Sequence, residues 1–67
     1  MAKITLAAAR VSAGLTQEQL AEKMGVTRKT ITKWETGKTR IKPAYLYAFC
    51  GFTGFSVDDI LLPEKYA

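Results

Sequence analysis

Two short helix patterns that meet at a glycine occupy residues 16–37, and this feature limits the fold more than any other in the chain. The first pattern opens with Thr16 and Gln19, and a Thr-x-x-Gln spacing is typical of a capping box at the start of a helix. Apolar residues, beginning with Leu20, then follow at the three- and four-residue spacing of an amphipathic helix. Gly25 supplies the left-handed residue that commonly ends one. The sequence therefore predicts a helix that begins after Thr16 and ends at Gly25.

A second amphipathic pattern follows the glycine at once. Thr27 can cap it, and Ile31 and Trp34 fall on one side when residues are placed about 100° apart around a helix axis. The opposite arc holds only polar side chains, namely Arg28, Lys29, Thr32 and Lys33. Two helices joined by so tight a glycine turn form a helix-turn-helix, and DNA-binding versions insert the second helix into the major groove. We therefore predict a helix at about residues 27–36 with a basic outer face.

Positive charge is concentrated in one part of the sequence. The chain has ten Lys and Arg residues against six Asp and Glu, which gives a net charge of +4. Six of the ten lie within residues 28–42, where Glu35 is the one acidic residue: Arg28, Lys29, Lys33, Lys38, Arg40 and Lys42. A solvated charged face is the usual alternative for such a run. Clustering on one segment instead favours a polyanionic partner, and nucleic acid is the obvious one.

The remaining segments also read as helices. A helix is predicted over residues 4–13, and another starts with Pro43 in its first turn and ends at Gly54. A short fifth helix is predicted to open with Ser56 and to bury Ile60 and Leu61 before Pro63 stops it. At 67 residues and 48% hydrophobic composition, the chain has room for one domain, residues 1–67, with a single core. The predicted fold is all-α, a compact five-helix domain.

Several side chains are assigned to the core or its border. Arg10 and Glu35 fall beside the inner faces of their helices, so they are candidates for a partly buried ion pair, with two solvated charges as the alternative. Aromatic residues at helical spacing are interpreted as core or core-edge residues: Trp34, Phe49, Phe52 and Phe55. Cys50 is interpreted as a small core residue. Tyr45 and Tyr47 follow the basic loop, and either hydroxyl is a candidate for a phosphate contact.

The composition argues against several classes of function. The chain contains no histidine and a single cysteine, so it cannot form an internal disulfide or a Cys/His zinc site, and we expect no metal or cofactor. No acid, base and nucleophile converge in the pattern, so we do not expect an enzyme. Gly37-Lys38-Thr39 resembles the end of a phosphate-binding loop, but Thr32 stands where that loop needs glycine. No signal peptide or membrane span is evident, which predicts a cytoplasmic protein.

Taken together, the motifs Leu15-Thr16-Gln17, Leu20-Ala21, Gly25-Val26-Thr27 and Ile31-Thr32-Lys33-Trp34-Glu35-x-Gly37-Lys38 resemble those of a known family. The chain is similar to the phage repressor and Cro type of helix-turn-helix proteins, over about residues 6–61. The resemblance implies a lambda-repressor-like five-helix fold that binds operator DNA as a dimer. Residues 42–53 depart from the family pattern, because tyrosine, phenylalanine and glycine replace a leucine-rich helix.

The resemblance also implies roles for individual residues. The family's base-reading positions correspond to Arg28, Lys29, Lys33 and, in addition, Thr32. Its DNA-backbone positions correspond to Gln17, Thr27, Thr30, Lys38 and Arg40, and the residue at Gln17 also supports the first base-reading side chain. A buried Arg-Glu pair recurs in some members, which corresponds to Arg10 with Glu35.

These observations predict a sequence-specific regulator of transcription, encoded by a bacterium or phage, that binds double-stranded DNA and acts as a repressor. A domain this small is expected to bind a palindromic operator as a homodimer, one that assembles mainly on the DNA. The alternative is a protein-interaction module of the same fold, such as an antitoxin, in which the fold mainly covers a protein partner.

Overall fold

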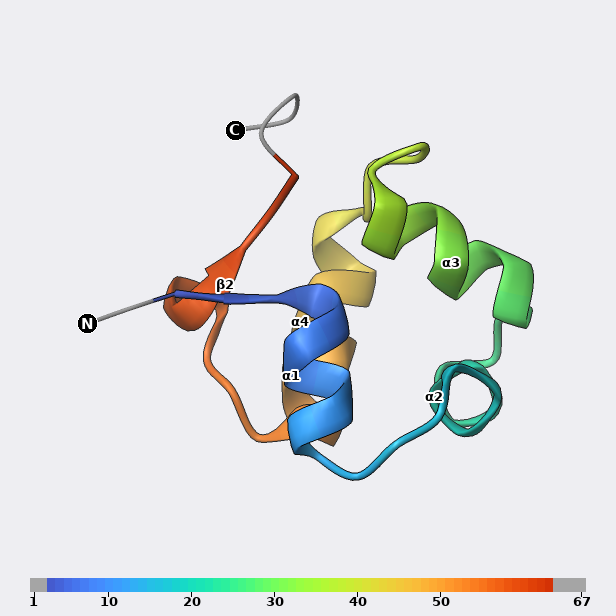
Figure 1. The fold of residues 1–67 in the computed structure, drawn as a ribbon, viewed down its shortest axis with the longest axis horizontal. Helices are drawn as coiled ribbons and strands as arrows, with labels where there is room; N and C mark the ends of the chain where they lie inside the picture. The colour runs from blue at the N-terminus through green and yellow to red at the C-terminus, as the bar shows by residue number, and fades with distance from the viewer. Residues whose placement is uncertain (1–2, 64–67) are drawn as a thin grey trace.

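The computed structural model describes residues 3–63, in which four α-helices enclose a core and two short strands lie side by side (Figure 1). The helices are α1 (Leu6–Ser12), α2 (Gln17–Met24), α3 (Arg28–Thr36) and α4 (Pro43–Thr53). The strands are β1 (Ile4–Thr5) and β2 (Ile60–Leu61), and a single 3-10 turn, η1 (Val57–Asp59), precedes β2.

The helix-turn-helix is formed by α2 and α3, with the ends that the sequence predicts. Thr16 Oγ1 accepts a hydrogen bond from the Gln19 backbone N–H at 3.0 Å, and the Gln19 side chain accepts one from the Thr16 N–H at 2.9 Å. Gly25 ends α2 with φ 70°, in the left-handed region. Thr27 caps α3 by accepting a bond from the Thr30 N–H at 3.2 Å. The predicted capping box, glycine turn and second helix are therefore confirmed.

The first helix is shorter than predicted. It spans Leu6–Ser12 rather than residues 4–13, because Thr5 is its N-cap and accepts a hydrogen bond from the Ala8 N–H at 3.1 Å. An N-cap residue has extended backbone angles, so the chain before it leaves the helix. Ile4 and Thr5 instead form β1, which suits two β-branched side chains.

The predicted fifth helix is wrong, and with it the all-α five-helix class. Ser56 caps only the single turn of η1, after which Ile60 and Leu61 extend as β2. β2 runs parallel to β1, with Ile4 opposite Ile60 and Thr5 opposite Leu61. Length does not decide this conformation, because the segment is long enough for an α-helix of the seven residues found in α1. Pairing with β1 buries Ile60 to 5% exposure without one.

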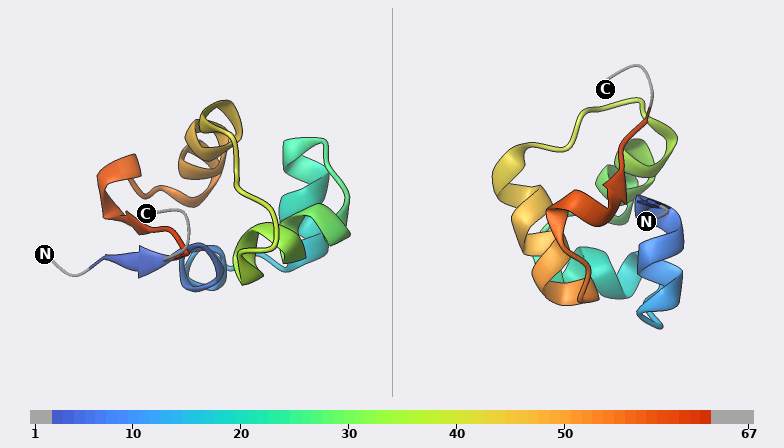
Figure 2. Two further views of the ribbon diagram at one scale, coloured as in Figure 1. Left: turned by 90° about the horizontal axis from the view of Figure 1, so that it is seen from above. Right: turned by 90° about the vertical axis from the view of Figure 1, so that its left-hand side faces the viewer.

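The core is built from all four helices, the loop before α4, and β2. Its buried residues are Leu6, Ala9, Leu20, Ala21, Ile31, Trp34, Ile41, Phe49, Cys50 and Ile60. Phe49 and Cys50 form the predicted inner side of α4, and burial, with a smaller effect of Asp59, raises the pKa of the Cys50 thiol. Phe52 was predicted at the core edge but is 45% exposed, which corrects that assignment. Figure 2 shows α4 on one side of the molecule, with α1 and α3 on the other.

Candidate nucleic-acid interface

The outer face of α3 carries the basic side chains. Ile31 and Trp34 are buried beneath the helix, at 1% and 5% exposure, and hold it against the core. The four side chains of the opposite arc are exposed: Arg28, Lys29, Thr32 and Lys33. The amphipathic pattern thus leaves the cationic side of α3 open to a partner.

Further polar groups lie at both ends of α3. At its N-terminus the hydroxyls of Thr27 and Thr30 lie 3.0 Å apart, with Thr27 exposed and Thr30 partly buried. At its C-terminus Gly37 turns the chain with φ 80°, and Lys38 and Arg40 are exposed in the loop that follows. The fold therefore places cationic or hydroxyl groups along the whole outer length of the helix.

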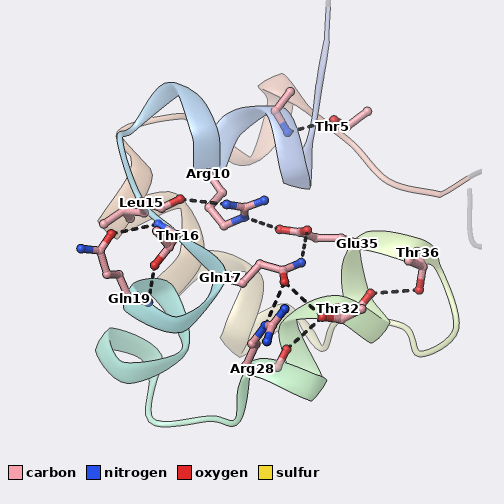
Figure 3. Close-up of polar contacts among 11 residues, drawn as sticks. Thr5, Arg10, Leu15, Thr16, Gln17, Gln19, Arg28, Thr32, Glu35 and Thr36 are labelled. Carbon is pink, nitrogen blue, oxygen red and sulfur yellow. Dashed lines mark hydrogen bonds and ion pairs between the residues drawn. The ribbon is translucent and has the colours of Figure 1, made fainter.

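Gln17, the first residue of α2, connects this face to the rest of the molecule (Figure 3). Its amide nitrogen donates a hydrogen bond to Glu35 Oε1 at 2.9 Å. Its amide oxygen accepts one from Arg28 Nε at 3.3 Å and lies 3.4 Å from the Thr32 hydroxyl. That hydroxyl is also 3.2 Å from the backbone carbonyl oxygen of Arg28, so its single hydrogen is used within the protein.

Behind Gln17, Arg10 and Glu35 are in direct contact. Arg10 Nε donates to Glu35 Oε2 at 2.7 Å, and Arg10 Nη1 donates to the Leu15 carbonyl oxygen at 2.8 Å. Only 14% of the Arg10 side chain and 8% of the Glu35 side chain are exposed. An unbroken series of polar contacts therefore runs from the end of α1, through Glu35 and Gln17, to Arg28 on the open face (Figure 3).

Comparison with known proteins identifies the family of this chain. The family model described as helix-turn-helix matches residues 6–60, from the start of α1 to β2. The chain belongs to this helix-turn-helix family, of the phage repressor and Cro type. The members are DNA-binding transcription regulators.

Two known proteins named as HTH-type transcription regulators are also similar in sequence to this chain. The chain is 39% identical over 56 residues to the HTH-type transcriptional activator BcrR of Enterococcus faecalis. The aligned region covers 84% of this chain and 28% of that protein. The chain is 40% identical over 50 residues to an uncharacterized HTH-type transcriptional regulator of Methanocaldococcus jannaschii, covering 75% of this chain and 76% of the relative. The chain thus spans about a quarter of one relative and three quarters of the other.

Within residues 3–63, no group of three or more His, Cys, Asp or Glu side chains is placed to hold a metal ion. Over the same residues, none of the helices has the length and hydropathy needed to cross a bilayer.

The sequence pattern does not predict the bond between Gln17 and Glu35. The sequence pattern assigns Gln17 to the DNA backbone and to support of the first base-reading side chain, and it pairs Glu35 only with Arg10. The two residues lie 18 positions apart on different helices, and a helical wheel gives the face of a residue but not its partner on another helix. The one sequence signal for this bond is that both residues are polar and lie next to positions that face the core.

Proposed function

We propose that this chain is a sequence-specific transcription regulator that inserts α3 into the major groove of operator half-sites in double-stranded DNA. The observation that carries the proposal is the exposed cationic face of α3, backed by the buried side chains of Ile31 and Trp34. A helix of this shape fits the major groove, and its charge complements the phosphates on either side. The proposal assigns no enzymatic activity to the chain and places it in the cytoplasm, with access to DNA.

The base-reading contacts are assigned to the open face: Arg28, Lys29, Thr32 and Lys33. Arginine and lysine pair best with the O6 and N7 acceptors of guanine, so the half-site should contain at least one or two guanines. The Thr32 hydroxyl hydrogen is engaged inside the protein, which supports a methyl contact from Thr32 to thymine.

The DNA-backbone contacts are assigned to the residues around that face: Gln17, Thr27, Thr30, Lys38 and Arg40. Their exposure and their position at the ends of α3 support this assignment for Thr27, Lys38 and Arg40. Such contacts set the register of the protein on the duplex and carry no sequence information themselves.

The operator is proposed to be palindromic and bound by two copies of the chain, with half-sites about one helical turn, roughly 34 Å, apart. We propose that the homodimer assembles mainly on DNA, and sedimentation with and without the operator tests this. The proposed outcome of binding is repression, whereas the relative from Enterococcus faecalis is named an activator. A reporter promoter that carries the operator distinguishes the two.

The decisive experiment is selection of bound duplexes from a random pool, followed by affinity measurements on the selected sequence. A palindromic selected sequence supports the proposal. If the chain binds no duplex at moderate salt and instead forms a stoichiometric complex with another protein, the proposal is wrong and the interaction-module alternative replaces it.

Two variants test the division of contacts on that operator. Arg28→Ala should weaken binding by about 1–3 kcal/mol and relax the preference at one base pair. Lys38→Ala should weaken all sequences alike and reduce the slope of log K against log salt by about 0.9. Equal losses on operator and random duplex for both variants would contradict the division.

A further inference from the structure

We propose that Glu35 is a positioning residue for base recognition, which determines the base that Arg28 reads by fixing the orientation of the Gln17 amide. Glu35 itself is largely removed from solvent, with 8% of its side chain exposed. The inference rests on the proposed function, and it deepens that function by assigning base preference to a residue that touches no DNA.

The first step is the fixed position of the Glu35 carboxylate. Its Oε2 accepts from Arg10 Nε at 2.7 Å, and Arg10 is in turn held by the Leu15 carbonyl at 2.8 Å. The other oxygen, Oε1, faces Gln17. An ionised carboxylate has no hydrogen to donate, so Glu35 presents a pure acceptor to its neighbour.

The second step follows from the two ends of an amide group. Gln17 can bond Glu35 only through its NH₂ group, since the reverse orientation would place two acceptor oxygens 2.9 Å apart. The nitrogen and oxygen of an amide are assigned from such networks, and this network permits a single assignment. The Gln17 oxygen must therefore point away from Glu35, toward Arg28 and Thr32 in the first half of α3.

The Gln17 oxygen in turn holds Arg28 in place. The Gln17 oxygen accepts from Arg28 Nε at 3.3 Å, and within residues 3–63 Nη1 and Nη2 make no hydrogen bond. These two nitrogens form the fork that matches O6 and N7 of guanine. A reversed Gln17 amide would instead turn its NH₂ group toward the guanidinium, donor against donor, and displace the fork.

The test replaces the Glu35 carboxylate, which only accepts hydrogen bonds, by an amide, which can also donate them. In Glu35→Gln the new amide oxygen should keep the bond from Arg10, and its NH₂ group should force Gln17 to reverse. The preference for guanine at the base pair read by Arg28, measured as the ratio of Kd values for duplexes that differ only there, should fall at least about fivefold. Adding Gln17→Glu should restore the preference, because a carboxylate at position 17 accepts from both sides.

A matched pair of variants in α2 completes the test. Gln17→Met keeps the Arg10–Glu35 pair but removes the acceptor for Arg28, so it should lose the same guanine preference. Gln19→Met makes the same substitution two residues away, where within residues 3–63 the side chain bonds only the Thr16 N–H, and should leave the preference unchanged. Circular dichroism at the assay temperature verifies that each variant is folded.

The possible outcomes separate this inference from the proposed function. If the wild-type chain shows no base preference at any position, the proposed function fails. If the wild type prefers guanine and folded Glu35→Gln retains that preference, the inference is overturned while the proposed function stands. If Glu35→Gln does not fold, Gln17→Met must lose the preference and the double variant Gln17→Glu/Glu35→Gln must keep it; any other pattern also overturns the inference.

Discussion

Arg10 has a larger structural role than an isolated surface arginine. Its guanidinium bonds Glu35 and the Leu15 carbonyl, and so links α1 to both α3 and the loop before α2. Ion pairs on protein surfaces contribute little, but this pair is largely removed from solvent. Removal of one partner from such a pair leaves the other charge buried without compensation.

We therefore expect Arg10→Ala to lower the free energy of unfolding by about 3–5 kcal/mol in urea denaturation. Lys23→Ala is the matched control, because Lys23 is an exposed cation near the end of α2 and its removal should change stability by less than about 0.5 kcal/mol. Similar losses for the two variants would show that the Arg10–Glu35 pair has no special weight.

Single residues were predictable where a helical wheel determines their surroundings. The inward position of Arg10 and the outward position of Arg28 follow from the spacing of apolar residues on their own helices. The burial of Ile41 was not predictable in this way, because it lies between two cations in the loop before α4, where no helical wheel applies. The spacing of apolar residues along one helix determines which side chains face inward, whereas contacts between helices depend on how the helices are arranged in the fold.

At the scale of the elements, capping residues explain why α2, α3 and α4 match their predicted bounds so closely. Each begins after a residue with extended backbone angles and ends at a glycine with positive φ. The last segment lacks such a stop, and its Ser56 capping group is compatible with one turn or with many. Its conformation depends on β1, which lies more than 50 residues earlier in the chain and leaves no mark in the local sequence.

Gly51, inside α4, is the one helical glycine and has no structural requirement within the described residues. Its φ is not positive, and a Cβ there would meet nothing within 4 Å. Gly51→Ala should therefore raise the free energy of unfolding by about 0.5–1 kcal/mol, seen as a higher Tm, since alanine loses less conformational entropy in a helix.

Gly25→Ala provides the contrast for that prediction. A Cβ at Gly25 would also meet nothing within 4 Å, but the residue has φ 70°. Alanine in the left-handed region is unfavourable by about 1–2 kcal/mol, so this variant should melt at a lower temperature than the wild type. If Gly51→Ala also lowers Tm, the outer side of α4 needs a glycine for a reason outside the described chain.

At the scale of the whole molecule, the short sheet brings residues from the two ends of the described chain together. β1 precedes α1 and β2 follows η1, and their parallel pairing places Ile60 against the core formed by the helices. A domain of this size buries only about 60% of its unfolded surface, so one well-buried side chain is a large part of its stability.

Ile60→Ala should accordingly lower the free energy of unfolding by about 2–5 kcal/mol, because it removes buried methyl groups and leaves a cavity. Leu61→Ala, on the next residue of β2, is the control, since that side chain is 50% exposed and its loss should change stability far less. Urea titrations followed by Trp34 fluorescence and by circular dichroism provide the measurement. Coincident curves from the two probes would support the prediction of one cooperative domain. Separate curves, or a loss of stability in Ile60→Ala no larger than that in Leu61→Ala, would contradict the prediction. Either result would mean that the helices fold without β2 and that the strand pair adds little to their stability.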